Sequence, residues 1–478
     1  MKISRLFNLE KGQYELDFVD IDPDRDTPLF LDPYFLSIQT DQWSYEATTT
    51  IRSFFDQFIT FIRAGRFDEA RALFDHFREP NETCLGLSTG RPEGRGIGPG
   101  NADDLYASLR HSRAVATGIV EHLEDARIFV DGIGRDKISD MSTNILRAQL
   151  IQYTHDQCTL WNMPLQAGIA SGYYWSAQNR RWETTYTDRL VVNGRPLLLV
   201  PKGIVSFDDR YTPREYHGQF VLEYLQGHHI SMNSALVERR QDGTPFVTKK
   251  SVQTAEAPLS KRYLLEFTER HPEIFTNFRE RSASKMKRVV NEHLTPEELP
   301  AVANHLLELL RATPPGPDHA TQYHRLIAGI LELVFYPNLI TPRLEQEIHQ
   351  GRKRIDLTFA NAAGDGVFDR LHRVLNIPCG YIAIECKNYS RDIANPELDQ
   401  IGGRFAPNRG KVGLVISRSA ENLDLLIQRC ADTYADDRGL IIPLVDDDLI
   451  TILEGLAAGV ERPEESILSD RLTAIVMA

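Results

Sequence analysis

The chain has 478 residues, of which 42% are hydrophobic and 25% charged, as in ordinary globular proteins. No apolar run approaches the roughly 20 residues of a membrane-spanning helix, and the first residues lack the apolar segment of a signal peptide. The five cysteines are scattered without a Cys-x-x-Cys pair, which argues against a disulfide framework and a zinc ribbon. We therefore expect a cytoplasmic protein that does not contact a membrane. The net charge of −13 is unfavourable for binding nucleic acid over the whole surface.

Residues 1–205 are predicted to form an α+β domain of unknown role. Helical periodicity covers residues 44–77 with a break at Ala64–Gly65, and ARIFVDGIG (residues 126–134) is typical of a strand. The glycine-rich stretch 88–104 precedes a predicted helix, so its backbone amides could bind a phosphate. It matches neither common phosphate-loop pattern, and a surface loop with tight turns is the alternative.

Three aspartates follow the predicted strand, at the entry to the next helix: Asp131, Asp136 and Asp140. Acidic side chains in this position can bind a metal ion, which would make a possible second site. Aspartates also commonly form turns and cap helices, because their side chains accept hydrogen bonds from nearby backbone amides. Both interpretations stay open at this point.

A middle segment, residues 206–312, is predicted to be β-rich and then helical. Just before it, Asn193–Gly194 separates two apolar runs and predicts a tight hairpin. The helical section ends at TPPGPD (residues 313–318), where three prolines and a glycine indicate a linker. We place the third domain at residues 313–478.

Helical and strand patterns alternate in this third domain. Helices are predicted over 319–335, 396–406, 420–437 and 446–457, and strands over 340–349, 354–360, 381–387, 411–417 and 440–445. This order predicts an α/β (α+β) fold in which helices flank a mixed sheet.

Two of these strands carry charged residues among apolar ones. Asp356 lies in the middle of the strand RIDLTF, and Glu385 and Lys387 share one face of the strand YIAIECK. The apolar run KVGLVIS predicts a neighbouring central strand, so the charges would be buried and must pair with each other or hold a metal. Two carboxylates can bind a divalent cation that activates water for phosphodiester hydrolysis, and a lysine can stabilise the developing charge.

Other polar residues accompany this set. Gln400 and Arg404 share one face of a predicted helix, where Gln400 could orient Lys387, contact phosphate or simply be solvated. Glu332 lies in a mostly apolar helix and needs a partner, with Glu347 as a weaker alternative acid. Between Arg343 and Arg418, twelve Lys and Arg stand against nine Asp and Glu, a local charge of +3. The candidate nucleic-acid contacts are Arg352, Lys353, Arg354 and Arg404.

Over residues 318–445 these features resemble the PD-(D/E)XK nuclease superfamily, especially its Mrr-like and Holliday-junction-resolvase-like branches. The matching residues, in order, are Glu332 in the first helix, Asp356 in a strand, Glu385–Cys386–Lys387 in the next strand, and Gln400 in the following helix. The chain departs from the common pattern in having Ile rather than Pro before Asp356. For the N-terminal part we identify no resemblance.

The resemblance implies a restriction-endonuclease-like fold and a metal-dependent endonuclease. It implies that Asp356 and Glu385 bind Mg²⁺ or Mn²⁺, that Lys387 is the electrostatic catalyst, and that Glu332 and Gln400 support them. The expected substrate is nucleic acid, with DNA preferred, and the expected context is restriction or anti-phage defence. A homodimer or larger homo-oligomer and a regulatory ligand or partner protein are also compatible with it.

Two other functions remain open. The chain could be a nucleic-acid-binding scaffold on a nuclease-like fold that has lost its activity, although such a site usually lacks one of its three charges and this one has all of them. Alternatively, the chemistry could lie in the N-terminal half, around Asp131–Asp140.

Overall fold

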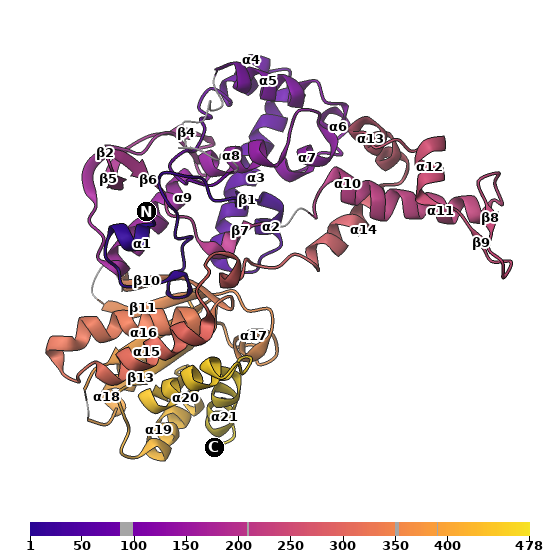
Figure 1. Ribbon diagram of the computed structural model, residues 1–478. Coiled ribbons are helices and arrows are strands. Elements are labelled where there is room, and N and C mark those ends of the chain that lie inside the picture. The colour runs from indigo at the N-terminus through magenta and orange to yellow at the C-terminus, as the bar shows by residue number, and fades with distance from the viewer. Residues whose placement is uncertain (87–98, 208–209, 349–352, 390) are drawn as a thin grey trace.

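The computed structural model describes residues 1–86, 99–207, 210–348, 353–389 and 391–478. In Figure 1 a mainly helical N-terminal part lies above a C-terminal sheet with its helices, and an arm extends to one side. Among the described residues, no helix combines the length and the apolar character needed to cross a lipid bilayer.

The N-terminal part is built around the long helix α3 (Gln42–Arg63), in which Phe54 and Phe58 are fully buried. Asp41 caps this helix by accepting the backbone N–H of Ser44 at 2.8 Å. The other helices here are α1 (Ile3–Leu6), α2 (Pro33–Ser37), α4 (Phe67–Ala72), α5 (Pro99–Arg110), α6 (Arg113–Ala116), α7 (Ala126–Phe129), α8 (Arg135–Ile145) and α9 (Arg147–Trp161).

Short strands complete this part. They are β1 (Phe30–Leu31) paired with β7 (Val205–Ser206), β2 (Gln166–Ala170) with β5 (Tyr186–Val192) and β6 (Arg195–Leu197), and β3 (Tyr174–Ser176) with β4 (Arg181–Glu183). The hairpin predicted at Asn193–Gly194 is confirmed, because both residues have positive φ and join β5 to β6.

The strand predicted over residues 126–134 is wrong, because α7 occupies Ala126–Phe129. The carboxylate of Asp125 accepts the backbone N–H of His122 and begins a helical turn just before it. Ile128 and Phe129 are both buried. A short apolar run of this kind fits a buried helical turn as well as a strand, so periodicity alone does not separate the two.

The middle segment forms the arm. Its helices are α10 (Pro213–Tyr216), α11 (Leu222–Ser231), α12 (Lys249–Ala255), α13 (Lys261–Arg270) and α14 (Pro272–Ala283), with the hairpin β8 (Glu238–Arg239) and β9 (Pro245–Phe246) at the tip in Figure 1. Helix α15 (Leu299–Ala312) then lies beside the C-terminal sheet.

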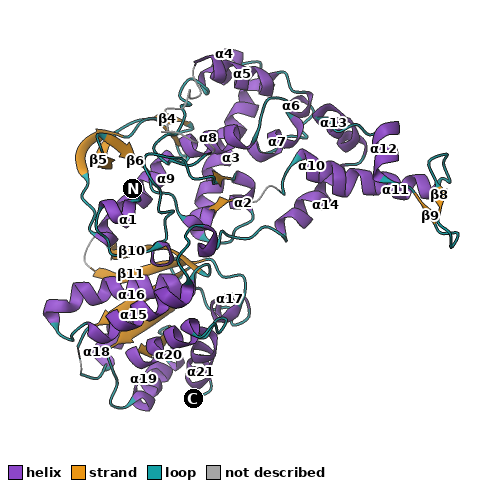
Figure 2. Cartoon of the chain, viewed as in Figure 1, coloured by secondary structure: helices purple, strands orange, loops and turns teal. Residues whose placement is uncertain are grey.

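The C-terminal part has the predicted alternation of helices and strands (Figure 2). Its elements are α16 (Ala320–Phe335), β10 (Leu339–Ile348), β11 (Lys353–Asn361), α17 (Gly366–Arg373), β12 (Tyr381–Lys387), α18 (Asn395–Gly402), β13 (Val412–Ser417), α19 (Leu423–Ala435), β14 (Leu440–Val445), α20 (Asp446–Ala457) and α21 (Glu464–Val476). The five strands follow the order β10-β11-β12-β13-β14, antiparallel as far as β12 and parallel from β12 onward. The mixed sheet flanked by helices is therefore as predicted.

Helices α16 and α18 cover different faces of this sheet. Ala383 on β12 pairs with Gly413 on β13, and Ile401 and Phe405 pack so closely on Gly413 that a Cβ there would collide with them. On the other side, His324 of α16 lies 3.1 Å from the carbonyl of Cys386. Side chains alternate along β12, so Glu385 points to the same face as Ala383, the face that α18 covers.

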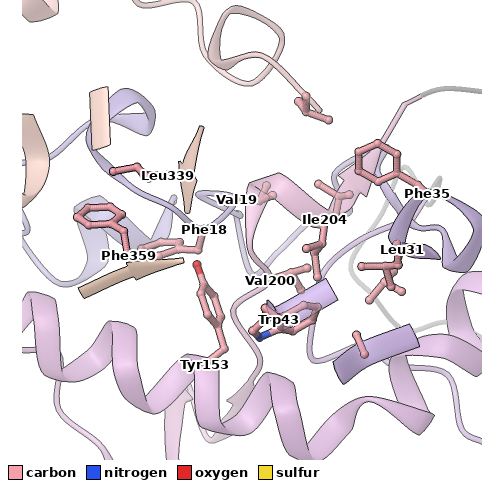
Figure 3. Close-up of a cluster of buried hydrophobic side chains, with 14 of the residues drawn as sticks. Phe18, Val19, Leu31, Phe35, Trp43, Tyr153, Val200, Ile204, Leu339 and Phe359 are labelled. Carbon is pink, nitrogen blue, oxygen red and sulfur yellow. The ribbon is translucent and has the colours of Figure 1, made fainter. Parts of the chain in front are cut away.

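The N-terminal and C-terminal parts share one hydrophobic core. Figure 3 shows Phe18 and Tyr153 of the N-terminal part close to Leu339 and Phe359 of the sheet, and all four belong to a single buried cluster. Gln157 on α9 also donates a hydrogen bond to the carbonyl of Pro342 on β10, at 3.1 Å. The sheet is thus held against the N-terminal part through its β10 edge.

The predicted linker at residues 313–318 does not mark a boundary in packing, because the helix before it packs against a helix after it. Helix α15, which precedes it, packs against α20, and Arg311 pairs with Glu454 at 2.8 Å. The buried side chains of α15 are Ala303, Leu306, Leu307 and Leu310.

We expect a fragment of residues 295–478 to melt cooperatively and well above a fragment of residues 313–478. Both lose the same N-terminal contacts, but only the shorter one loses the buried leucines of α15, each worth about 1.5–3 kcal/mol when fully buried. Circular dichroism melts of the two purified fragments check this. Equal melting temperatures would mean that α15 contributes nothing to the C-terminal fold.

Candidate active site

The site lies where β11 and β12 stop pairing. Their paired register ends at Leu357 opposite Ile384, and the next residue on each strand is Asp356 or Glu385. The carboxylate of Asp356 accepts the backbone N–H of Cys386 at 3.1 Å, so the side chain crosses to the neighbouring strand. Both carboxylates are thereby placed side by side at the point where the sheet opens.

Glu385 is fully buried and is surrounded by hydrogen-bond donors. The Nε of Arg404 donates to its Oε1 at 2.7 Å, and the Nζ of Lys387 donates to its Oε2 at 3.2 Å. The Nε2 of Gln400 lies 3.4 Å from the same Oε2. Two cations and an amide therefore neutralise and orient one buried carboxylate.

The electrostatics of the site reflect burial and like charge. Burial and the adjacent Asp356 carboxylate raise the pKa of Glu385 to about 7, although Lys387 and Arg404 act in the opposite direction. Burial alone would lower the pKa of Lys387, but the carboxylates of Glu385 and Asp356 raise it above its usual value. Near neutral pH, both the protonated and the ionised forms of Glu385 are therefore populated, while Lys387 remains charged.

Helix α18 supplies the polar side of the site. Glu397 accepts the backbone N–H of Ala394 at 3.1 Å and Pro396 lies in the first turn, and both features begin the helix at this position. Gln400, near its end, places Oε1 3.5 Å from the Nζ of Lys387. Gln400 is itself exposed, so it can reach both the buried ions and a molecule bound from solvent.

Two carboxylates fit a magnesium site of the open kind. Mg²⁺ commonly takes one or two protein carboxylates and completes its six ligands with water and substrate phosphate. The described part of the chain contains no group of three or more His, Cys, Asp or Glu side chains placed to hold a metal. Asp356 is partly exposed, so a cation can approach it, whereas Oε1 of Glu385 is engaged by Arg404. An ion that binds both carboxylates must compete with that guanidinium.

Glu332, expected to support this site, takes its partners elsewhere. It is 1% exposed and pairs with Lys202 of the N-terminal part, whose Nζ lies 3.1 Å from its Oε1. Burial and the nearby Asp17 raise the pKa of Glu332 to about 8, although Lys202 lowers it. The predicted need for a partner is met, but by an ion pair between the two parts of the chain and not by the Asp356–Glu385 site.

This ion pair belongs to a larger buried network. Lys202, fully buried, also donates to the side chain of Asn291 at 3.0 Å. Asp17 accepts the hydroxyl of Tyr153 at 2.6 Å and the backbone N–H of Thr341, on β10, at 2.9 Å. We call Asp17, Lys202 and Glu332 the interdomain triad. Two carboxylates and one ammonium thus connect the N-terminal part to the first helix and strand of the sheet.

The possible second site does not assemble a metal-binding group among the described residues. Asp131 and Asp136 are exposed at the surface, and Asp140 is half-buried on α8. Burial raises the pKa of Asp140 to about 7, and the charges of Glu79 and Asp136 add to this. Asp136 and Asp140 therefore repel each other, whereas Asp131 interacts with the ammonium of Lys261.

Several predicted contacts lie outside the described residues. They include Arg352, residues 88–98 of the glycine-rich stretch, and the side chains of Glu347, Lys353 and Arg354. Arg404 is described, and it is bound to Glu385 inside the site, 8% exposed, instead of facing solvent. The sequence indicated that Arg404 lies on the same side as Gln400, because the two residues are four positions apart at the end of α18.

The family described as Domain of unknown function (DUF8370) matches residues 8–212. This range covers the N-terminal part and ends just before α10. Comparisons with curated proteins and with solved structures give no match.

Proposed function

We propose that the chain is a divalent-metal-dependent nuclease that hydrolyses phosphodiester bonds of nucleic acid at the Asp356–Glu385–Lys387 site. The observation that carries this proposal is the gathering of two carboxylates and a lysine at the point where β11 and β12 diverge. Burying like charges together is costly, and the pKa of Glu385 records that cost. Such an arrangement serves a site that takes up a cation.

The side chains divide the work by position. Asp356 and Glu385 would hold Mg²⁺ or Mn²⁺, and a bound ion of this kind polarises phosphate and lowers the pKa of water. Lys387 keeps its charge beside Glu385 and can stabilise negative charge on the phosphate. Gln400 lies within 3.5 Å of the Lys387 ammonium and holds it in position from the exposed side.

The proposed biological role rests on the resemblance of residues 318–445 to the PD-(D/E)XK nuclease superfamily. DNA is the preferred substrate, in a cytoplasmic restriction or anti-phage defence system, and the N-terminal part recognises a signal or restrains the nuclease. Assembly as a homodimer or larger homo-oligomer is compatible with this role. The shared core and the interdomain triad support coupling between the two parts, because a change in one would be felt at β10.

The test is a cleavage assay with the whole chain. Supercoiled plasmid, linear duplex, single-stranded DNA and RNA are incubated with Mg²⁺, with Mn²⁺ or with EDTA, and products are separated by electrophoresis. We expect cleavage of at least one DNA substrate that requires the ion and stops in EDTA. Cleavage unchanged in EDTA, or no cleavage of any substrate although the chain binds it, would reject the proposal.

A further inference from the structure

A small, partly open cavity lies beside Glu385 on the same face of the sheet. Its volume is about 80 Å³, which exceeds the roughly 30 Å³ share of one water molecule. Its floor is formed by Thr358 on β11 and Ala383 on β12, which are paired across the sheet. Arg404, Phe405 and Arg409, which follow α18, enclose it from the other side.

The polar side chains that line this cavity, those of Thr358, Tyr381, Arg404 and Arg409, can all donate hydrogen bonds, and no carboxylate is among them. The hydroxyl of Thr358, a residue 4% exposed, is buried without a hydrogen-bond partner in the described part of the chain. The Nε of Arg409 is also buried without a hydrogen-bond partner in the described part of the chain. The Nη2 of the same residue donates to the carbonyl of Arg404 at 3.1 Å. Buried donors without partners are costly, so this cavity is arranged for an acceptor.

Arg404 connects the cavity to the carboxylate site. Its Nε donates to Glu385, and within the described residues its two Nη groups make no hydrogen bond. A guanidinium presents donors in two directions and pairs well with phosphate oxygens. One side chain thus faces the proposed metal ligand and, at the same time, the anion-sized cavity.

We propose that this cavity binds a phosphate group of the nucleic-acid substrate, and that phosphate and Glu385 compete for the guanidinium of Arg404. This inference rests on the proposed function for the nature of the ligand. A phosphate in the cavity forms an ion pair with the guanidinium of Arg404. The hydrogen bond from Arg404 to Oε1 of Glu385 is then weakened, and this oxygen becomes available to a cation. By linkage, phosphate and the divalent ion then strengthen each other's binding by the same factor. The site would therefore load its ion fully when a substrate phosphate is present.

The first experiment needs neither metal nor catalysis. Binding of inorganic phosphate to the whole chain in EDTA is measured by calorimetry, against chloride at equal ionic strength. We expect saturable binding that weakens about tenfold in Thr358→Val, which removes one hydrogen bond to a charged ligand, and by more in Arg409→Met. Arg429→Met is the matched control, because Arg429 also donates to a backbone carbonyl, that of Ile393, but lies outside the cavity. Equal binding by wild type and Thr358→Val, or loss in Arg429→Met, would overturn the assignment.

Two further measurements test whether the bound phosphate belongs to nucleic acid and whether phosphate and the divalent ion strengthen each other's binding. Oligonucleotide affinity in EDTA should fall in Thr358→Val alongside phosphate affinity; a fall for inorganic phosphate alone would overturn the substrate assignment. Saturating phosphate should tighten Mn²⁺ binding several-fold in wild type and have no effect in Arg404→Met, and an equal effect in both would overturn the coupling. If phosphate binds as expected but no nucleic acid is cleaved, the proposed function fails and the phosphate site stands. If nucleic acid is cleaved but phosphate does not bind, the phosphate site fails and the proposed function stands.

Discussion

Asp356→Asn is expected to abolish ion-dependent cleavage, by at least about a thousandfold, while the fold stays intact. Asparagine keeps the shape of the side chain and its hydrogen bond to the Cys386 N–H, but it removes the charge that would hold the ion. Without metal, the melting temperature should hold or rise, because Asp356 and Glu385 no longer repel each other. Gel-based rates and thermal melts in EDTA measure both effects.

Companion variants make this result specific. Lys387→Met should retain Mn²⁺ binding and lose turnover about a hundredfold or more, because its charge acts on the reacting phosphate. Asp399→Asn is the matched control: Asp399 lies on α18, is exposed, and pairs with Arg438 at the surface. It should cleave at the wild-type rate. Wild-type cleavage by Asp356→Asn would refute the site, and Lys387→Met with lost ion affinity and normal rate would reverse the roles of the two residues.

Glu385→Gln is a different kind of variant from Asp356→Asn. Arg404 and Lys387 are both held by the Glu385 carboxylate, and in the variant they would face a neutral amide inside the protein. Removing one partner from a buried ionic group leaves the remaining charges uncompensated. We therefore attribute loss of activity in Glu385→Gln to the site only when its melt matches the wild type.

Lys202→Met is expected to lower the free energy of unfolding by about 3 to 5 kcal/mol, because it leaves Asp17 and Glu332 buried without their ammonium. All three members of the interdomain triad are at most 1% exposed, so water cannot solvate the two carboxylates that lose their ammonium. Denaturant unfolding followed by circular dichroism measures the loss. Lys249→Met, which breaks a solvent-exposed pair with Glu223, is the control and should change stability by less than about 1 kcal/mol.

The pH dependence of the stability of Lys202→Met distinguishes the loss of the ammonium charge from the loss of side-chain packing. The pKa of Glu332 is raised from its usual 4.5 to about 8, so the folded protein holds a proton that the unfolded chain releases between these values. Its contribution to stability therefore falls as pH rises through this window. Lys202 lowers this pKa, so its removal should extend the fall to pH values above 8 and make the deficit of Lys202→Met larger at pH 9 than at pH 5. A deficit that does not vary with pH would show that the missing methylene packing, not the charge, is responsible.

The sequence by itself determined the sheet and the strand positions of the main candidate residues. Period-two alternation around Asp356, Glu385 and Lys387 placed these residues on strands, and the all-apolar run Val412–Ser417 predicted the central neighbour that buries them. Such patterns are local, and each strand occupies close to its predicted range. Asn395–Pro396 likewise marked the start of α18, because capping and the fixed φ of proline act within one turn.

Only the tertiary structure decided which charges meet. Glu332 was assigned to the active site from the resemblance and from its need for a partner, but its partner, Lys202, is 130 residues away along the chain. Arg404 was expected to contact nucleic acid, and only the fold shows that its Nε binds Glu385 while the side chain lines the cavity beside it. Sequence shows that a buried charge must be compensated, because desolvation is costly wherever it occurs. The identity of the compensating group depends on contacts between distant segments, which periodicity and spacing do not contain.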